Sequence, residues 1–370
     1  AFILFTVGTT TLKIDNISVQ EIIGDKPRID YSDSSTEPSL LLEPQSTNLI
    51  PYSEDFNNSG WNKIAATITP NNGISPDGTQ NSDLFVPNSS GGQVYDGLGY
   101  KPASAISYTT SLYVKPKGLN SLRIYLHGSS NANRGDATFN LSNQTVSFSN
   151  NGAFTSTSAS ILNVGNGWYR CILVTTSDTS TGLQLVIRYD GSTDNVSGLN
   201  LWGCQTEQNS YATSYIPTSG STATRLGETA NNAGGAGVFN SEEGVLYAEI
   251  KRAEGNATSA AISLNNGTSS NGVSMYFFGV NNFYVDIFNS SGTVTVAGGV
   301  VSISDYIKVA VKYKNGDSAI WINGIEVGTN SAAVSLVGLN QLLFAYTNGG
   351  LPFYGKTKNI QVFNYALTDE

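Results

Sequence analysis

Short runs in which apolar and polar residues alternate recur roughly every ten residues along this chain, bounded mostly by Gly, Asn, Ser or Asp. In one such run Leu122, Ile124 and Leu126 take every second position, and polar or aromatic residues lie between them. Because side chains two residues apart share one face of a strand, each run predicts a strand with a core face and an open face. Further alternating runs lie at residues 111–115, 183–188, 273–278, 283–288 and 307–313.

The pattern predicts an all-β protein of stacked sheets, because no stretch has the period of a long amphipathic helix. The pairs Asn315-Gly316 and Asn323-Gly324 each follow a predicted strand. Both are expected to form type I′ hairpin turns, since Asn and Gly tolerate the positive φ that this turn requires.

A small, polar, glycine-rich segment at residues 228–238 predicts a linker between two domains, at residues 27–227 and 239–370. The chain opens on Ala, with an apolar run at residues 1–7 and an alternating run at 12–22. We therefore expect residues 1–26 to be the end of a preceding domain or a linker strand. A native edge strand is the alternative.

Composition and charge exclude several classes of protein. The formal net charge is −9, which argues against a broad nucleic-acid surface. No apolar run approaches the length of a transmembrane helix, so membrane insertion is not expected. One His and two Cys leave little for zinc or histidine chemistry, and no cofactor is required by any motif.

Several runs in the expected first domain resemble a module of tailed-phage virion proteins. They follow that family's order and cover nearly the whole domain, with Cys204 standing where the family usually has Ala. The resemblance implies a carbohydrate-binding-module-like jelly roll from a tail fibre, tail tip or head appendage. The runs are PRIDY at 27–31, LLLEPQSTNL at 40–49, YSEDF at 52–56, Trp61, SPDGT at 75–79, Asp83, VGNGWYRC at 164–171, LWGCQTE at 201–207, YATSYIPT at 211–218 and Thr224-Arg225.

The expected second domain resembles the laminin-G-like branch of the concanavalin-A-like sandwiches. The resemblance rests on VKYKNGD at 311–317, IWING at 320–324 and the tail from Tyr354 to Glu370. Together the two resemblances imply two tandem jelly-roll β-sandwiches. These resemblances say little about the ligand, because proteins of this fold bind glycans, bind other proteins or serve in assembly.

Catalysis is not expected. Hydrolases of this fold place two carboxylates across the scissile bond, and their Glu-x-Asp-x-x-Glu trace does not occur here. Glu242 and Glu243 are adjacent, so on a strand they would point to opposite faces. A serine nucleophile motif, a phosphate-binding loop and a dinucleotide fingerprint are also missing from the sequence.

The polar faces of predicted strands supply candidates for glycan binding, since aromatic rings stack on sugars and cationic groups donate to hydroxyl or acidic groups. A solvated face or a contact with a neighbouring domain is the alternative. In the second domain Tyr276, Phe278, Tyr284 and Phe288 form a similar aromatic set, which a packed sheet or a partner could instead cover. The glycan-binding candidates are Tyr113, Lys115, Arg123, Tyr125, His127 and Arg188.

Two further residue pairs have open interpretations. Asp77 and Asp83 lie in a polar stretch and could ligate Ca²⁺ through oxygen, although Asp-Gly is commonly a simple turn. Cys171 and Cys204 fall on two predicted strands, and we expect buried free thiols rather than a disulfide.

The combined prediction is a non-catalytic virion adhesion protein that binds host surface polysaccharide and other virion proteins, as a homo-oligomer on an exposed appendage. One alternative is a purely structural spacer or docking subunit of the virion. The other is a set of accessory binding modules from a secreted bacterial polysaccharide-degrading enzyme.

Overall fold

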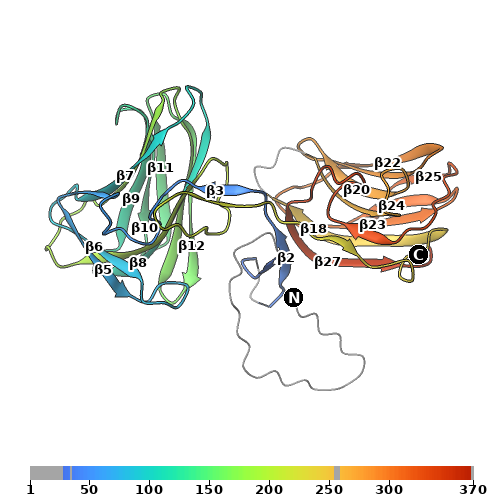
Figure 1. Ribbon diagram of the computed structural model, residues 1–370, viewed down its shortest axis with the longest axis horizontal. Helices are drawn as coiled ribbons and strands as arrows, with labels where there is room; N and C mark the ends of the chain where they lie inside the picture. The colour runs from blue at the N-terminus through green and yellow to red at the C-terminus, as the bar shows by residue number, and fades with distance from the viewer. Residues whose placement is uncertain (1–27, 34–35, 254–258, 368–370) are drawn as a thin grey trace, which may run out of the picture. The chain divides into compact units, whose positions relative to one another are not determined.

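The computed structural model describes residues 28–33, 36–253 and 259–367. The expected strands at 1–7 and 12–22, and the boundary at residue 26, lie outside these ranges. The described residues contain no helix, and their sheets are assembled from antiparallel strand pairs (Figure 1). The all-β prediction is therefore confirmed, and no helix in the described ranges is long and apolar enough to cross a membrane.

Two compact units make up the chain, and their boundaries differ from those expected. Unit 1 combines the described residues up to Pro44 with those from Leu226 onward, and unit 2 spans Gln45–Arg225. The expected first domain began at residue 27, but Arg28–Asp30 and Ser39–Leu42 form strands of unit 1. The expected linker at 228–238 contains a strand of unit 1 as well.

Unit 1 is a sandwich of two antiparallel sheets. The first has the spatial order β1 (Arg28–Asp30), β2 (Ser39–Leu42), β27 (Gly355–Phe363), β18 (Glu243–Arg252), β23 (Ile307–Lys314), β24 (Ser318–Ile322) and β25 (Ile325–Asn330). The second has the order β17 (Asn231–Ala233), β26 (Gln341–Leu343), β19 (Ala260–Asn265), β20 (Gly272–Phe278), β21 (Asn282–Asn289) and β22 (Gly292–Val300).

Unit 2 is a second sandwich. One sheet has the order β11 (Thr145–Asn151), β10 (Arg134–Asn140), β9 (Ser121–His127), β14 (Gly182–Arg188), β7 (Gln93–Tyr100) and β4 (Asn62–Ile64). The other has the order β12 (Thr155–Gly165), β13 (Trp168–Thr176), β8 (Ser107–Lys117), β15 (Gly198–Glu207), β6 (Ser82–Pro87) and β5 (Ala66–Gly73). A short pair, β3 (Ser46–Asn48) with β16 (Ala223–Arg225), joins the two ends of the unit.

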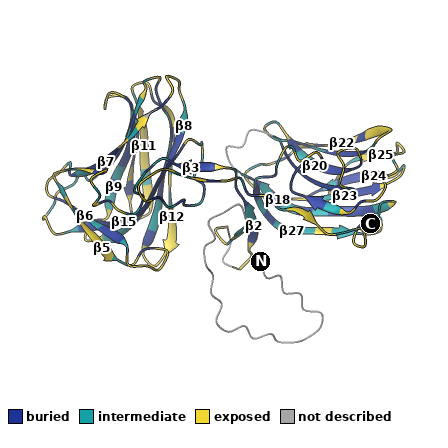
Figure 2. Cartoon of the chain, viewed as in Figure 1, coloured by how far each residue is buried: buried dark blue, intermediate teal, exposed yellow. Residues whose placement is uncertain are grey.

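The alternation in the sequence separates core from surface as expected. In β9, Leu122, Ile124 and Leu126 are at most 1% exposed and belong to the core of unit 2. The apolar positions of β14, β20, β21 and β23 are buried in the same way. Figure 2 shows buried residues of the chain in dark blue.

The two predicted hairpin turns form, but only one is of the expected type. Asn323 and Gly324 both have positive φ, at 52° and 82°, as a type I′ turn requires. In the other turn Gly316 alone has positive φ, and the N–H of Asp317 donates to the carbonyl of Lys314 at 3.0 Å. Type I′ geometry is therefore wrong for the turn after β23.

A buried ion-pair cluster holds unit 1 together where the chain leaves it and returns. Arg28 donates to Glu228 at 2.8 Å and also contacts Glu43. The Glu228 carboxylate accepts from the backbone N–H of Glu43 at 2.7 Å, and the N–H of Glu228 donates to the carbonyl of Glu43 at 2.9 Å. These contacts connect the segment before unit 2 to the segment after it.

Candidate functional site: the arginine face of unit 2

Four of the six glycan-binding candidates lie together on the outer face of one sheet of unit 2. Strand register places His127 opposite Gln184, Tyr125 opposite Val186 and Arg123 opposite Arg188. Their neighbours in sequence point into the core, so these side chains point outward. We call this surface the arginine face; it comprises Arg123, Tyr125, His127, Arg134, Asp136, Arg188 and Asp190.

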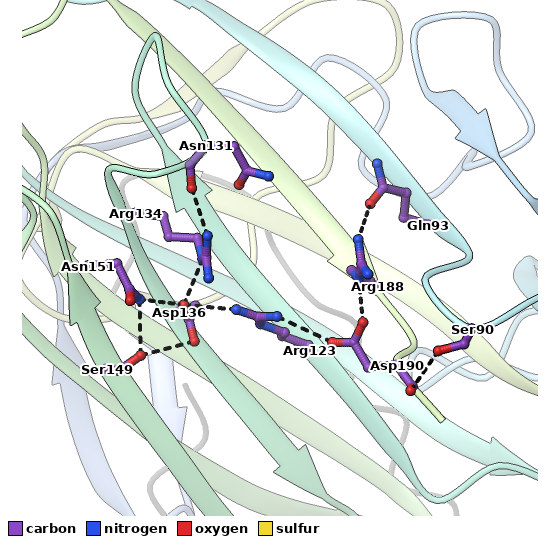
Figure 3. A network of polar contacts seen from close by, with 10 residues as sticks. All are labelled: Ser90, Gln93, Arg123, Asn131, Arg134, Asp136, Ser149, Asn151, Arg188 and Asp190. Atoms are coloured by element: carbon purple, nitrogen blue, oxygen red, sulfur yellow. Dashed lines mark hydrogen bonds and ion pairs between the residues drawn. The ribbon is translucent and has the colours of Figure 1, made fainter. Parts of the chain in front are cut away.

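A connected row of ion pairs crosses the arginine face (Figure 3). Asp136 accepts from Arg123 at 3.0 Å and from Arg134 at 2.9 Å. Asp190 accepts from Arg123 at 3.3 Å and from Arg188 at 2.5 Å. The row extends to Asn151 at one end and Gln93 at the other. Three guanidinium groups are thus held in fixed positions by two carboxylates.

Aromatic side chains lie within this row. The guanidinium carbons of Arg123 and Arg134 are 5.3 Å and 5.7 Å from the ring centroid of Tyr125, within cation–π range. The Tyr125 side chain is only 4% exposed. His127 lies next along the strand, where Nδ1 donates to the carbonyl of Gly128 at 2.7 Å and Nε2 contacts Gln184 at 2.7 Å.

The ionisable groups of this face are held in their charged forms, and the arginines remain accessible to solvent. Burial works against the charged form of Arg123, but hydrogen bonds and charge from Asp136 and Asp190 outweigh it and raise the pKa of Arg123. Burial alone would raise the pKa of Asp190, yet Arg188 and Arg123 lower it. The arginine side chains remain 23–33% exposed, so their outer N–H groups can reach an anionic or hydroxyl-bearing ligand.

The remaining two candidates, Tyr113 and Lys115, do not join this site. They lie on β8, in the other sheet, and point away from the core on the opposite side of the sandwich. Tyr113 packs against Trp202 and Tyr215, with ring centroids 5.3 Å and 6.2 Å away. The six candidates therefore do not form a single site, because alternation gives the face of a strand but not its sheet.

Sequence interpretation missed three members of the face. Arg134 and Asp136 lie on β10, where they alternate with Gly135 and Ala137. This alternation could have placed Arg134 and Asp136 on the outer face of a strand from the sequence alone. Asp190 follows the end of β14 and is positioned by Arg188, a contact that alternation alone does not reveal.

The calcium candidates Asp77 and Asp83 are not brought into a shared ligand set. One oxygen of Asp77 accepts from the N–H and hydroxyl of Thr79, at 2.9 Å and 2.8 Å, in a turn. Asp83 accepts from the backbone N–H groups of Phe56 at 2.8 Å and Asn71 at 2.9 Å. Both carboxylates thus hold loops in place. Across the described residues, no group of three or more His, Cys, Asp or Glu could hold a metal ion.

Asp83 also borders an open cavity of about 620 Å³ in unit 2. Burial raises the pKa of Asp83, its backbone donors lower it, and the nearby Asp55 carboxylate raises it further. Polar residues make up most of the cavity lining. Its other lining residues are Tyr52, Glu54, Asp55, Asn57, Asn58, Pro70, Asn71, Asn81, Thr218 and Ser219.

Both cysteines are free and buried, as predicted. Burial raises the pKa of each thiol above its ordinary value, which disfavours the reactive thiolate. They contribute to the core of unit 2 and not to a surface site.

No family model and no curated protein matches this chain. Among solved structures, the CBM40 of the Ruminococcus gnavus IT-sialidase bound to α2,3-sialyllactose is 20% identical, with a TM-score of 0.32. The match covers 38% of this chain and 90% of that one.

Two other solved structures show a similar degree of likeness. A NanB sialidase mutant from Streptococcus pneumoniae is 17% identical over 35% of this chain and 23% of that one, with a TM-score of 0.30. A SAP-like pentraxin from Limulus polyphemus is 13% identical over 38% of this chain and 70% of that one, with a TM-score of 0.31. None of these three is a virion protein, so that resemblance rests on the sequence runs alone. The likeness is too partial to assign a function.

Proposed function

We propose that this chain is a non-catalytic adhesion protein whose unit 2 binds acidic polysaccharide on the arginine face. The supporting observation is the row of three guanidinium groups, held by Asp136 and Asp190 and left about a quarter to a third exposed. Guanidinium groups fixed before binding lose little freedom when they pair with a carboxylate or sulfate.

The sequence resemblance further suggests that this adhesion serves a tailed-phage virion, with the chain displayed on an exposed appendage. Several copies on one particle would convert weak contacts with a host polysaccharide into strong attachment. A secreted bacterial protein carrying the same binding unit is the alternative setting.

The test is a glycan array probed with the full chain, displayed on a multivalent support, in its natural form and as Arg188→Ala. Arg188 suits the test because its side-chain hydrogen bonds, to Asp190 and Gln93, lie within the outer face of the sheet. Lys115→Ala is the matched control, since Lys115 lies on the other sheet.

We expect signal on acidic glycans that weakens with salt and falls in Arg188→Ala but not in Lys115→Ala. An absence of signal on every acidic glycan, or equal signal from all three proteins, would contradict the proposal.

A structural role is the second candidate, because the arginines are already paired with aspartates within the face. In that case the ion-paired row would stiffen a spacer or meet another subunit. Association of the full chain with a virion subunit, lost in Arg188→Ala and accompanied by no glycan signal, would favour it.

A further inference from the structure

A second surface, in unit 1, has the chemistry of a binding site. In β20, Val273, Met275 and Phe277 are buried in the core, so Ser274, Tyr276 and Phe278 lie on the opposite face of the sheet. Strand β21 places Tyr284, Asp286 and Phe288 on that same face, since Tyr276 pairs with Tyr284 and Ser274 with Asp286.

Five aromatic rings form a continuous row on this face, which we call the aromatic strip. It runs from Phe278 through Tyr284, Tyr276 and Tyr346 to Phe288. The successive ring centroids are 6.1, 5.8, 5.8 and 5.9 Å apart. Phe278, at one end, is 57% exposed. Each ring is thus within contact distance of the next. The three tyrosines are partly exposed, and Phe288, at the other end, is 6% exposed.

Asp286 holds the strip in position. Its two carboxylate oxygens accept from the hydroxyl of Thr295 at 2.7 Å and from the hydroxyl of Tyr346 at 2.9 Å. Burial, followed by the charge of Asp286, raises the pKa values of Tyr276 and Tyr346, so both phenols stay protonated and able to donate. The rings are therefore fixed before any ligand arrives, which lowers the entropic cost of binding.

Hydrogen-bonding capacity remains beside the rings. The hydroxyl of Ser274 is fully buried opposite Asp286 and has no hydrogen-bond partner in the described part of the chain. Each carboxylate oxygen of Asp286 can accept about two hydrogen bonds. The Ser274 hydroxyl and the Asp286 carboxylate, which is 8% exposed, are thus buried polar groups on the same face of the sheet as the rings.

The charge of the sheet restricts the ligand. Strands β17, β19, β20, β21, β22 and β26 contain no Lys, Arg, His or Glu, and Asp286 is their one acidic residue. An anionic ligand would find no cationic partner on these strands and would meet the Asp286 carboxylate. Neutral sugar residues carry no charge, and their C–H faces can pack on the rings of the strip.

From these contacts we infer that the aromatic strip binds a neutral glycan chain laid across β20 and β21. This site extends the proposed adhesive function to unit 1, but it does not depend on the arginine face. The two sites divide the ligands by charge, with acidic polysaccharide on unit 2 and neutral polysaccharide on unit 1.

Affinity electrophoresis of the full chain tests the inference, with laminarin, galactomannan, dextran or starch in the gel. The variants are Phe278→Ala and Tyr284→Ala. Tyr365→Ala is the matched control, because Tyr365 is a 52% exposed aromatic residue of unit 1 outside the strip. Arg188→Ala separates this site from the arginine face.

We expect at least one of the four polysaccharides to retard the natural chain, Tyr365→Ala and Arg188→Ala equally. Removing one ring should weaken that retardation about five- to tenfold. Near-ultraviolet circular dichroism unchanged from the natural chain will show that Phe278→Ala remains folded. Retardation by none of the four overturns the inference, as does retardation that both strip variants retain. Binding to acidic glycans alone would leave the unit 2 proposal standing and refute this one.

Discussion

Replacing Asp96 with Asn should change how the stability of unit 2 depends on pH. Asp96 lies on β7 opposite Leu185, on the core side of the sheet, and is 6% exposed. No hydrogen bond to its carboxyl comes from the described part of the chain, and burial raises its pKa from 3.8 to about 6. The charged form is therefore disfavoured inside the sandwich.

The size and sign of the change in stability follow from the difference between the pKa of Asp96 in the folded state and in the unfolded state. A pKa that moves from 3.8 to about 6 on folding corresponds to at most about 3 kcal/mol. This contribution is fully present below pH 3.8, where both states are protonated. It is lost as the pH rises through 6, since the folded state must then hold a buried carboxylate. Asn cannot ionise, so Asp96→Asn should gain up to about 3 kcal/mol relative to the natural chain between pH 4 and pH 7.5.

Urea denaturation followed by tryptophan fluorescence can measure this change in unit 2 alone. Trp61, Trp168 and Trp202 are buried in unit 2, and the fourth tryptophan, Trp321, lies in unit 1. A Trp321→Phe background therefore restricts the signal to unit 2. Comparing the two pH values cancels any fixed cost of the amide.

Asp194→Asn is the control whose pH dependence lies below the measured range. The N–H groups of Ser197 and Val196 lower the pKa of Asp194 to about 2, so its contribution is present above pH 3.8 and lost as the pH falls through 2. Its difference from the natural chain should therefore change little between pH 4 and pH 7.5. If Asp96→Asn differs from the natural chain by the same free energy at pH 4 and pH 7.5, the reasoning about Asp96 is refuted.

Three further predictions concern packing and backbone. Glu228→Gln should destabilise unit 1 by about 3 kcal/mol in chemical denaturation, because Arg28 loses a partner whose side chain is fully buried; unchanged stability would contradict this. Gly324→Ala should cost about 1 kcal/mol through its positive φ of 82°, while Gly235→Ala, at an ordinary φ with open space, should cost nothing measurable. Both cysteines should resist a thiol reagent until the chain is denatured, and rapid labelling of the folded chain would show that they are accessible.

Sequence alternation predicted the strands of both units well, because burial of one face imposes a period of two. It could not assign strands to sheets. Arg123 and Tyr113 each alternate with core residues, yet they lie on opposite sides of unit 2. The structure therefore divides the predicted glycan-binding candidates between two surfaces, and their role in binding stays a prediction.

The unit boundaries were harder to predict for a related physical reason. The strand at Ser39–Leu42 pairs with Gly355–Phe363, more than 300 residues away, and no local pattern encodes such a partner. The segment at 228–238 has the composition of a linker, but the backbone of Asn231 and Ala233 pairs with β26 regardless of side chain. Backbone hydrogen bonds do not depend on the identity of the side chains, so the amino-acid composition of a segment does not reveal them.

The insertion of unit 2 within unit 1 has a consequence for synthesis on the ribosome. Every strand of unit 2 has been made once Arg225 emerges, so this unit can fold while the chain is still growing. Strand β2 must wait for β27, the last strand in the described chain. Unit 2 can therefore fold first, and unit 1, which encloses it in sequence, is completed only after β27 has been made.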